Sequence, residues 1–200
     1  MKHEYIRTQI TATPFDNPHV KRIIYQEISH QNKIRQRPID ICDPFARESW
    51  MTKNPQGINT ITNDLNEKMP TDYHMEANDF CEHMAYMGEQ FDIILWDPPY
   101  NLSQLKRQYD GIGKKLEQWQ TLNPFGHAKD AITNCLRSGG SIISFGFNSK
   151  GFDGHRGMTK IAIYNLEPSG NEYRYNVQVV VERKFQTKIT SFSAISEQDA

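Results

Sequence analysis

The stretch that most constrains the fold runs from Phe91 to Asn101 and reads FDIILWDPPYN. Its first half is apolar on both alternating faces, which is typical of a short strand buried within a parallel sheet. Two successive prolines cannot donate backbone hydrogen bonds to a sheet, so we expect the strand to end at Asp97. Ligands of open α/β sheets bind beyond the carboxyl ends of the strands. Asp97 and Tyr100 are therefore candidates for a functional site.

Asp97-Pro98-Pro99-Tyr100 spells DPPY, and at this point the chain resembles the amino-group DNA methyltransferases that use S-adenosylmethionine. The resemblance implies that Asp97 and the backbone carbonyl of Pro98 accept hydrogen bonds from a planar amine. Because proline fixes φ, this carbonyl would be positioned in advance. Tyr100 would stack on a base flipped out of the duplex. The alternative interpretation is a strand followed by a Pro-Pro turn and a capping aspartate.

A second expected strand, near residues 38–42, is followed by Asp43, Pro44 and Phe45. This segment resembles the first motif of the same family, which implies that these residues begin the cofactor site. In the family the motif continues with glycines, which let backbone amides approach a ligand closely. Here Ala46 and Arg47 stand in their place. The alternative is an Asp-Pro turn followed by a solvated Arg-Glu pair.

A third expected strand, over 57–62, ends next to Asn63 and Asp64. An acid just past such a strand commonly accepts hydrogen bonds from ribose hydroxyls, so Asp64 is the candidate and Asn63 would assist it.

A short strand over 73–76, followed by Asp79 and Phe80, resembles the family's third motif. The resemblance implies that Asp79 bonds the adenine amine of the cofactor and that Phe80 packs on the ring. A helix N-cap or first-turn acid is an equally good interpretation of Asp79.

Taken together, the motifs resemble small methyltransferase-like proteins of phages and bacterial mobile elements. The resemblance implies an α/β, Rossmann-like class I methyltransferase fold with a mixed, mostly parallel seven-stranded sheet that ends in an antiparallel hairpin. We expect one domain over 1–189, with an N-terminal helical segment over 1–37, a mobile loop over 101–119 and a flexible tail over 190–200. The remaining expected elements are helices over 18–33, 78–87 and 122–137 and strands over 91–96, 141–146, 159–166 and 175–184.

Composition limits the other possibilities. No apolar run is long enough to span a bilayer, and the charged N-terminus does not resemble a signal peptide. Three widely spaced cysteines fit a reducing compartment such as the cytoplasm and offer no metal-ligand spacing, so we expect no metal. The resemblance implies that the cell is prokaryotic or phage-infected. The net charge of −1 does not favour strong nonspecific binding to nucleic acid.

DNA contact is therefore expected to be weak, with a short or loose sequence preference, and to come from the segment 101–119. This segment adjoins Tyr100 and carries Lys106, Arg107, Lys114 and Lys115. A solvated loop without such a role is the alternative.

Short connections around Pro55 and Pro70 would leave one face of the sheet thinly covered. Such a face indicates a homodimer, or a partner subunit that supplies target recognition, unless a loop or the N-terminal helix covers it.

The leading hypothesis is methyl transfer from S-adenosylmethionine to the N6 amine of adenine in DNA. A methyltransferase for another planar amine (cytosine N4, RNA or a protein amide) is the second hypothesis. The third is a catalytically silent subunit that binds the cofactor or nucleic acid. This third possibility is favoured by two observations. The first motif lacks its usual glycines, and the net charge of the chain is close to neutral.

Overall fold

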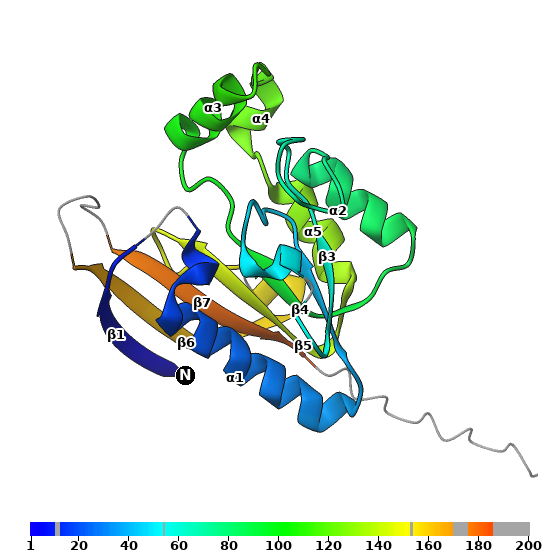
Figure 1. Ribbon diagram of the computed structural model, residues 1–200, viewed down its shortest axis with the longest axis vertical. Coiled ribbons are helices and arrows are strands. Elements are labelled where there is room, and N and C mark those ends of the chain that lie inside the picture. The colour runs from blue at the N-terminus through cyan, green and yellow to red at the C-terminus, as the bar shows by residue number, and fades with distance from the viewer. Residues whose placement is uncertain (11–12, 54, 153, 170–175, 186–200) are drawn as a thin grey trace, which may run out of the picture.

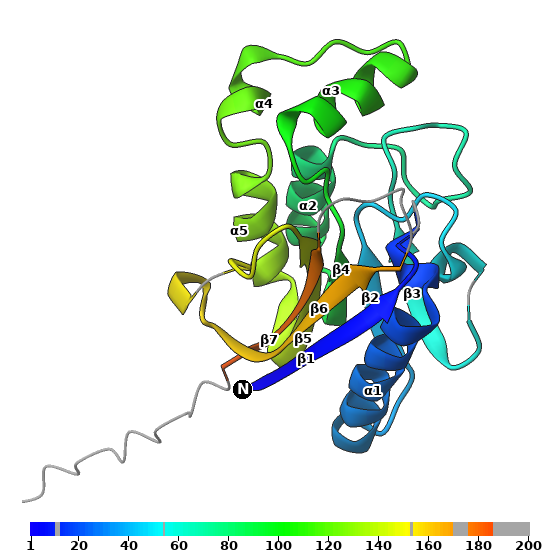
Figure 2. The ribbon, with the colours of Figure 1, turned by 90° about the vertical axis from the view of Figure 1, so that its left-hand side faces the viewer.

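The computed structural model describes residues 1–10, 13–53, 55–152, 154–169 and 176–185. One seven-stranded sheet has the order β1-β6-β7-β5-β4-β2-β3, with helices on both faces (Figures 1 and 2). Its elements are β1 (Lys2–Thr8), α1 (Pro18–Arg35), β2 (Ile39–Asp43), β3 (Ile58–Thr62), α2 (Ala77–Tyr86), β4 (Phe91–Trp96), α3 (Leu102–Gly111), α4 (Gln118–Leu122), α5 (Gly126–Asn134), β5 (Leu136–Gly146), β6 (Met158–Pro168) and β7 (Val177–Lys184), together with short 3-10 turns at Pro14–Asp16, Trp50–Lys53 and Gly154–Arg156.

The central strand β4 has two apolar faces because it is packed on both sides. Ile93 and Leu95 face the core under α1, whereas Ile94 and Trp96 face the core under α2 and α5. All residues of this strand are buried. The expectation of a fully buried strand that ends just before Asp97 is confirmed.

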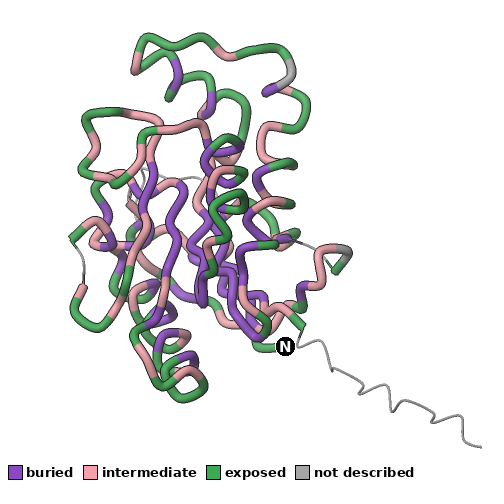
Figure 3. Tube along the Cα trace, turned by 90° about the vertical axis from the view of Figure 1, so that its right-hand side faces the viewer, coloured by how far each residue is buried: buried purple, intermediate pink, exposed green. Residues whose placement is uncertain are grey.

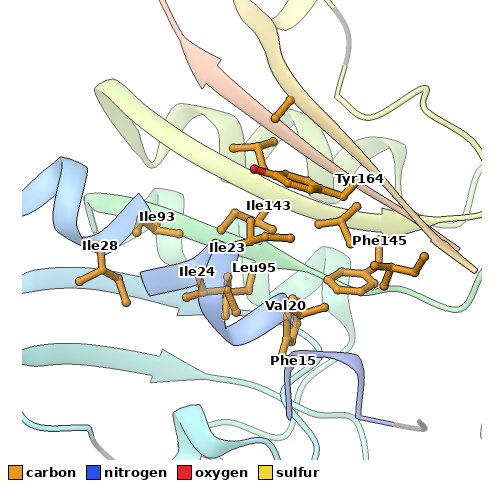
Figure 4. Close-up of a cluster of buried hydrophobic side chains, with 14 of the residues drawn as sticks. Phe15, Val20, Ile23, Ile24, Ile28, Ile93, Leu95, Ile143, Phe145 and Tyr164 are labelled. Carbon is orange, nitrogen blue, oxygen red and sulfur yellow. The ribbon is translucent and has the colours of Figure 1, made fainter. Parts of the chain in front are cut away.

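Helix α1 covers the sheet face that the sequence leaves thinly covered. Asn17 caps its N-terminus by accepting a hydrogen bond from the amide of His19 at 2.9 Å. The buried stripe of Val20, Ile23, Ile24 and Ile28 packs on the sheet (Figure 4). Burying each of these side chains contributes roughly 1.5–3 kcal/mol. The N-terminal helix, which was one of the two alternatives for this face, therefore covers it.

The expected mixed sheet with a terminal hairpin is confirmed, but one of its strands differs from the expectation. The segment 73–76 forms only an isolated bridge, between Asn63 and Tyr73. The seventh strand is instead β1, which pairs in parallel with β6. The segment 1–37 is therefore a strand followed by a helix, and not helical throughout. Only Ile6 of β1 is buried, so this edge strand has little apolar pattern to predict it.

The segment 101–119, expected as a loop, contains α3 and the start of α4. Asn101 caps α3 by accepting a hydrogen bond from the amide of Gln104 at 2.9 Å. Leu105 and Tyr109, four residues apart, are the buried residues of α3.

Two other expectations concern the second half of the chain. The helix expected over 122–137 is shorter, because α5 ends at Asn134 and β5 begins at Leu136. The tail 190–200 lies outside the described residues.

None of the helices in the described residues is long and apolar enough to cross a membrane.

Candidate active site

The candidate site lies at the carboxyl ends of β2, β3 and β4, below the α3–α4 segment. A cavity of about 360 Å³ opens there. We call it the cofactor cavity after the sequence-based hypothesis that the residues around it bind a cofactor. Its walls are the turn after β2, the loop after β3, the start of α2 and the inner side of α3. Buried strands lead to this edge, and mostly exposed chain lies beyond it (Figure 3). Pro44, Phe45, Asn63 and Asp64, all predicted from sequence, line the cavity.

Asn63 holds one wall of this cavity together. Its side-chain amide donates to the carbonyls of Pro44 and Met75, each at 3.1 Å. Its side-chain oxygen accepts from the amide of Met75 at 2.9 Å. Because these bonds tie the turn after β2 to the segment before α2, Asn63 acts on the shape of the cavity.

Asp64 is the acid that follows β3, as the sequence predicts. Its carboxylate accepts from the amide of Asn66 at 2.8 Å. Burial raises the pKa of this carboxyl, although the amide bond and the positive charge of Arg47 oppose the shift. A partly desolvated carboxylate in a cavity wall is suited to accept hydrogen bonds from hydroxyl groups.

Asp43 does not line the cofactor cavity. It is fully buried and accepts from the amide of Phe45 at 3.2 Å and from the Ser49 hydroxyl at 3.5 Å. Burial raises the pKa of its carboxyl well above the ordinary value. Asp43 therefore shapes the turn that presents Pro44 and Phe45.

The two residues of the third motif lie elsewhere. Phe80 is fully buried in the core between the sheet and α2, and Asp79 is an exposed acid in the first turn of α2. Neither lines the cofactor cavity, which leaves the first-turn interpretation of Asp79 in place.

Glu76 and Tyr109 occupy the cavity wall that the third motif was expected to form. The Tyr109 hydroxyl donates to the Glu76 carboxylate, and the Gln120 side-chain amide donates to the same hydroxyl at 2.8 Å. Burial raises the pKa of Tyr109. This network fastens α3 and α4 to the start of α2. Sequence reasoning missed it because the three residues meet only through the tertiary fold.

A second cavity, of about 290 Å³, contains all of Asp97-Pro98-Pro99-Tyr100 and is called the target cavity here. The Tyr100 hydroxyl donates to the Asp97 carboxylate at 2.7 Å. Burial raises the pKa of Asp97 to about 6, and the Tyr100 bond and the charge of Arg47 oppose that shift. A carboxylate with these neighbours can accept a hydrogen bond from an amine.

Tyr100 is held on two further sides. Its backbone amide donates to the Gln104 side chain at 2.8 Å, and its ring packs edge-on against Phe147 with the centroids 4.8 Å apart. The sequence indicated a role for the ring alone, whereas the structure also gives the hydroxyl a partner in Asp97.

The two cavities adjoin. Arg47, Pro99, Arg107 and Gln108 line both of them. A donor molecule in one cavity and an acceptor group in the other would therefore meet beside Pro99.

No protein-family model matches the chain, and no curated protein matches it in sequence. Among solved structures it is similar to a SAM-dependent methyltransferase from Agrobacterium tumefaciens, with a TM-score of 0.54 and 11% identity over 84% of this chain and 63% of that one. The chain has a methyltransferase fold.

Two further structures share this methyltransferase fold. The 1,6-didemethyltoxoflavin-N1-methyltransferase of Burkholderia thailandensis, solved with S-adenosylhomocysteine, has a TM-score of 0.52 and 14% identity over 84% of each chain. SMU.776, complexed with SAH, has a TM-score of 0.52 and 11% identity over 74% of this chain. The chain spans 46% of the length of SMU.776.

The basic residues predicted to contact DNA lie above the cavities of this methyltransferase fold. Lys106 and Arg107 are exposed on α3, and Lys114 and Lys115 are exposed shortly after it. Arg107 lines both cavities. Lys114 lines a third hollow, of about 330 Å³, next to the loop after β3.

Proposed function

We propose that this chain transfers a methyl group from S-adenosylmethionine to the N6 amine of adenine in DNA. The observation that carries the proposal is the position of Asp97-Pro98-Pro99-Tyr100 in a cavity that adjoins a second one of cofactor size. Small-molecule sites have volumes of about 300–1,000 Å³, a range that includes the cofactor cavity.

The residues of the cofactor cavity suit S-adenosylmethionine. Asp64, Phe45 and Phe125 all line this cavity. In the proposed complex Asp64 would accept hydrogen bonds from ribose hydroxyls, and the two phenylalanines would offer apolar surface to an adenine ring. When bound, the cofactor supplies a methyl group on a sulfonium, which is an electrophile. The chain's own contribution is to align an acceptor amine beside Pro99.

An adenine amine is a poor nucleophile, because its lone pair is delocalised into the ring. The Asp97 carboxylate and the Pro98 carbonyl would accept its two N–H bonds and direct the lone pair at the methyl group. Attack by the amine would form an N–C bond to the methyl group and break the S–C bond, with the electron pair left on sulfur. The amine nitrogen then loses one proton. Asp97 is a carboxylate in the same cavity that can accept this proton.

The test is methyl incorporation by the intact chain. Purified protein and tritiated S-adenosylmethionine are incubated with single-stranded DNA, duplex DNA and RNA, and the products are digested to nucleosides. We expect N6-methyladenine from DNA. Label only in cytosine or only in RNA would contradict the adenine and DNA assignments while keeping methyl transfer, and no label in any of these substrates would contradict the whole proposal.

Asp64→Ala is expected to weaken S-adenosylmethionine binding. Losing a charge-assisted hydrogen bond to a ribose hydroxyl costs about 1.5–3 kcal/mol, or roughly 10- to 150-fold in affinity. Isothermal titration measures the change. The matched control is Asp79→Ala, which removes an exposed acid outside the cavity and should leave the affinity unchanged. The opposite pattern would restore the third-motif role of Asp79 and remove Asp64 from the site.

Salt dependence tests the proposed DNA contact. Each neutralised phosphate contributes about −0.9 to the slope of log affinity against log salt, so Lys106, Arg107, Lys114 and Lys115 should give a slope of about −2 to −4. The double variant Lys114→Ala, Lys115→Ala should flatten it by about 1–2 units. Lys33→Ala, on the distant end of α1, is the control. A steep slope that responds to Lys33 alone would move the DNA surface to α1.

A further inference from the structure

Arg47 has an unusual backbone for its residue type. Its φ is +51°, in the left-handed region that favours glycine, and it lies in the turn after β2, where the motif that this segment resembles carries glycines. The turn thus keeps a glycine-like backbone but adds a long cationic side chain. Gln36, the other described residue that is not glycine and has a positive φ, is the C-cap of α1, whereas Arg47 lies beside the candidate site.

The position of Arg47 is also distinctive. It is partly buried and lines both the cofactor cavity and the target cavity. Its positive charge acts on the carboxylates of both Asp64 and Asp97. The guanidinium therefore belongs to the junction between the two cavities.

The charges around the cofactor cavity are divided by position. Among the described residues that line it, Asp64 and Glu76 are the acids and Arg47 and Arg107 are the cations. Both cations lie on the junction with the target cavity, while neither acid lines the target cavity. The cations of this cavity therefore lie where it meets the target cavity, and Arg47 also adjoins Asp64, because its backbone amide and its positive charge both lower the pKa of that carboxyl.

We propose that Arg47 binds the carboxylate at the amino-acid end of S-adenosylmethionine and so fixes the cofactor's methyl-bearing sulfur at the junction of the two cavities. The inference rests on the proposed function, because it takes this cofactor as the occupant. With the nucleoside end at Asp64, the amino-acid end, which carries the cofactor's single anionic group, lies toward the junction. An arginine matches a carboxylate with two parallel hydrogen bonds, which fix orientation as well as affinity.

Arg47 suits this role better than Arg107. Arg107 is exposed on α3, where water screens its charge, whereas Arg47 is partly shielded from water. Arg47 also comes from the turn that presents Pro44 and Phe45 to the same cavity. Arg47 is therefore a positioning residue that acts through the bound cofactor.

The experiment compares two ligands that differ only in the carboxylate. Isothermal titration measures the affinity of the wild-type chain for S-adenosylmethionine and for decarboxylated S-adenosylmethionine. Wild type should prefer the complete cofactor by about 10- to 100-fold, as expected for a charge-assisted pair. Arg47→Gly should remove most of this preference and leave the affinity for the decarboxylated ligand within about twofold. Glycine is the matched substitution, because it accepts the positive φ.

Two other variants complete the test. Arg47→Lys keeps the charge but not the paired geometry and should keep part of the preference. Arg107→Ala should keep all of it. A preference lost in Arg107→Ala and retained in Arg47→Gly would overturn the inference, as would equal weakening of both ligands by Arg47→Gly. If wild type binds neither ligand, the proposed function fails together with the inference, whereas tight binding of both without any preference overturns the inference alone.

Discussion

Replacing Asp97 by alanine is expected to lower the rate of methyl transfer about 10²–10³-fold, because a polarising contact to the acceptor amine is lost. The affinity for S-adenosylmethionine should stay within a few-fold, since Asp97 lines the target cavity and not the cofactor cavity. Single-turnover assays with saturating cofactor measure the first quantity, and isothermal titration measures the second. Turnover at the wild-type rate would show that the DPPY segment does not hold the acceptor.

The pH dependence of the same step follows from the carboxyl group. Asp97 must be ionised to accept hydrogen bonds from the amine, and burial raises its pKa to about 6. The rate should therefore be highest above this pH and fall as the pH decreases through about 6. Tyr100→Phe removes a hydrogen bond that favours the ionised form, so it should move the acid limb to higher pH. An acid limb that stays in place would show that the limb reports another group.

The sequence predicted the parts of the fold that depend on local pattern. The short apolar run before Asp97 is typical of a buried strand, and the prolines determined its end. The stripe from Val20 to Ile28 predicted α1 because its spacing is helical. The DPPY residues lie together in one cavity because they are consecutive at the end of a single strand.

The parts that were missed depend on contacts between distant segments. The edge strand β1 buries one apolar side chain, so it has no alternating pattern to detect. Helix α3 is mostly polar and basic, and it is held by Leu105 and by the Tyr109 bond to Glu76. Arg47 was noted only as a departure from the family motif. Its place between the cavities follows from the fold of the turn, although an arginine where glycines are usual was a signal that could have been used.

The strands that carry the site are fastened together at the opposite end of the sheet. Asp92, at the start of β4, is fully buried and forms ion pairs with Arg35 at 3.0 Å, Arg37 at 2.9 Å and Arg137 at 3.3 Å. It also accepts a hydrogen bond from the backbone amide of Asp40 at 3.0 Å. Because these partners come from α1, β2, β5 and the segment between α1 and β2, one carboxylate links four parts of the chain.

Asp92→Ala is expected to destabilise the fold by about 3 kcal/mol. Breaking a buried ion pair costs about 3–5 kcal/mol, and the lower end applies because the three arginines keep access to water. Urea unfolding followed by circular dichroism measures the change, with the slope compared between variants to confirm that the unfolding process is the same. Cofactor affinity of the folded fraction should be unchanged, since Asp92 lies outside both cavities.

Asp130→Ala is the matched control for this prediction. Asp130 also pairs with an arginine, Arg156 at 2.7 Å, but its side chain is 62% exposed. Exposed ion pairs contribute about 0–1 kcal/mol, because water screens the charges and two long side chains lose freedom. We therefore expect a loss several times smaller than for Asp92. Equal losses in the two variants would show that burial of the carboxylate is not what makes the Asp92 cluster stabilising.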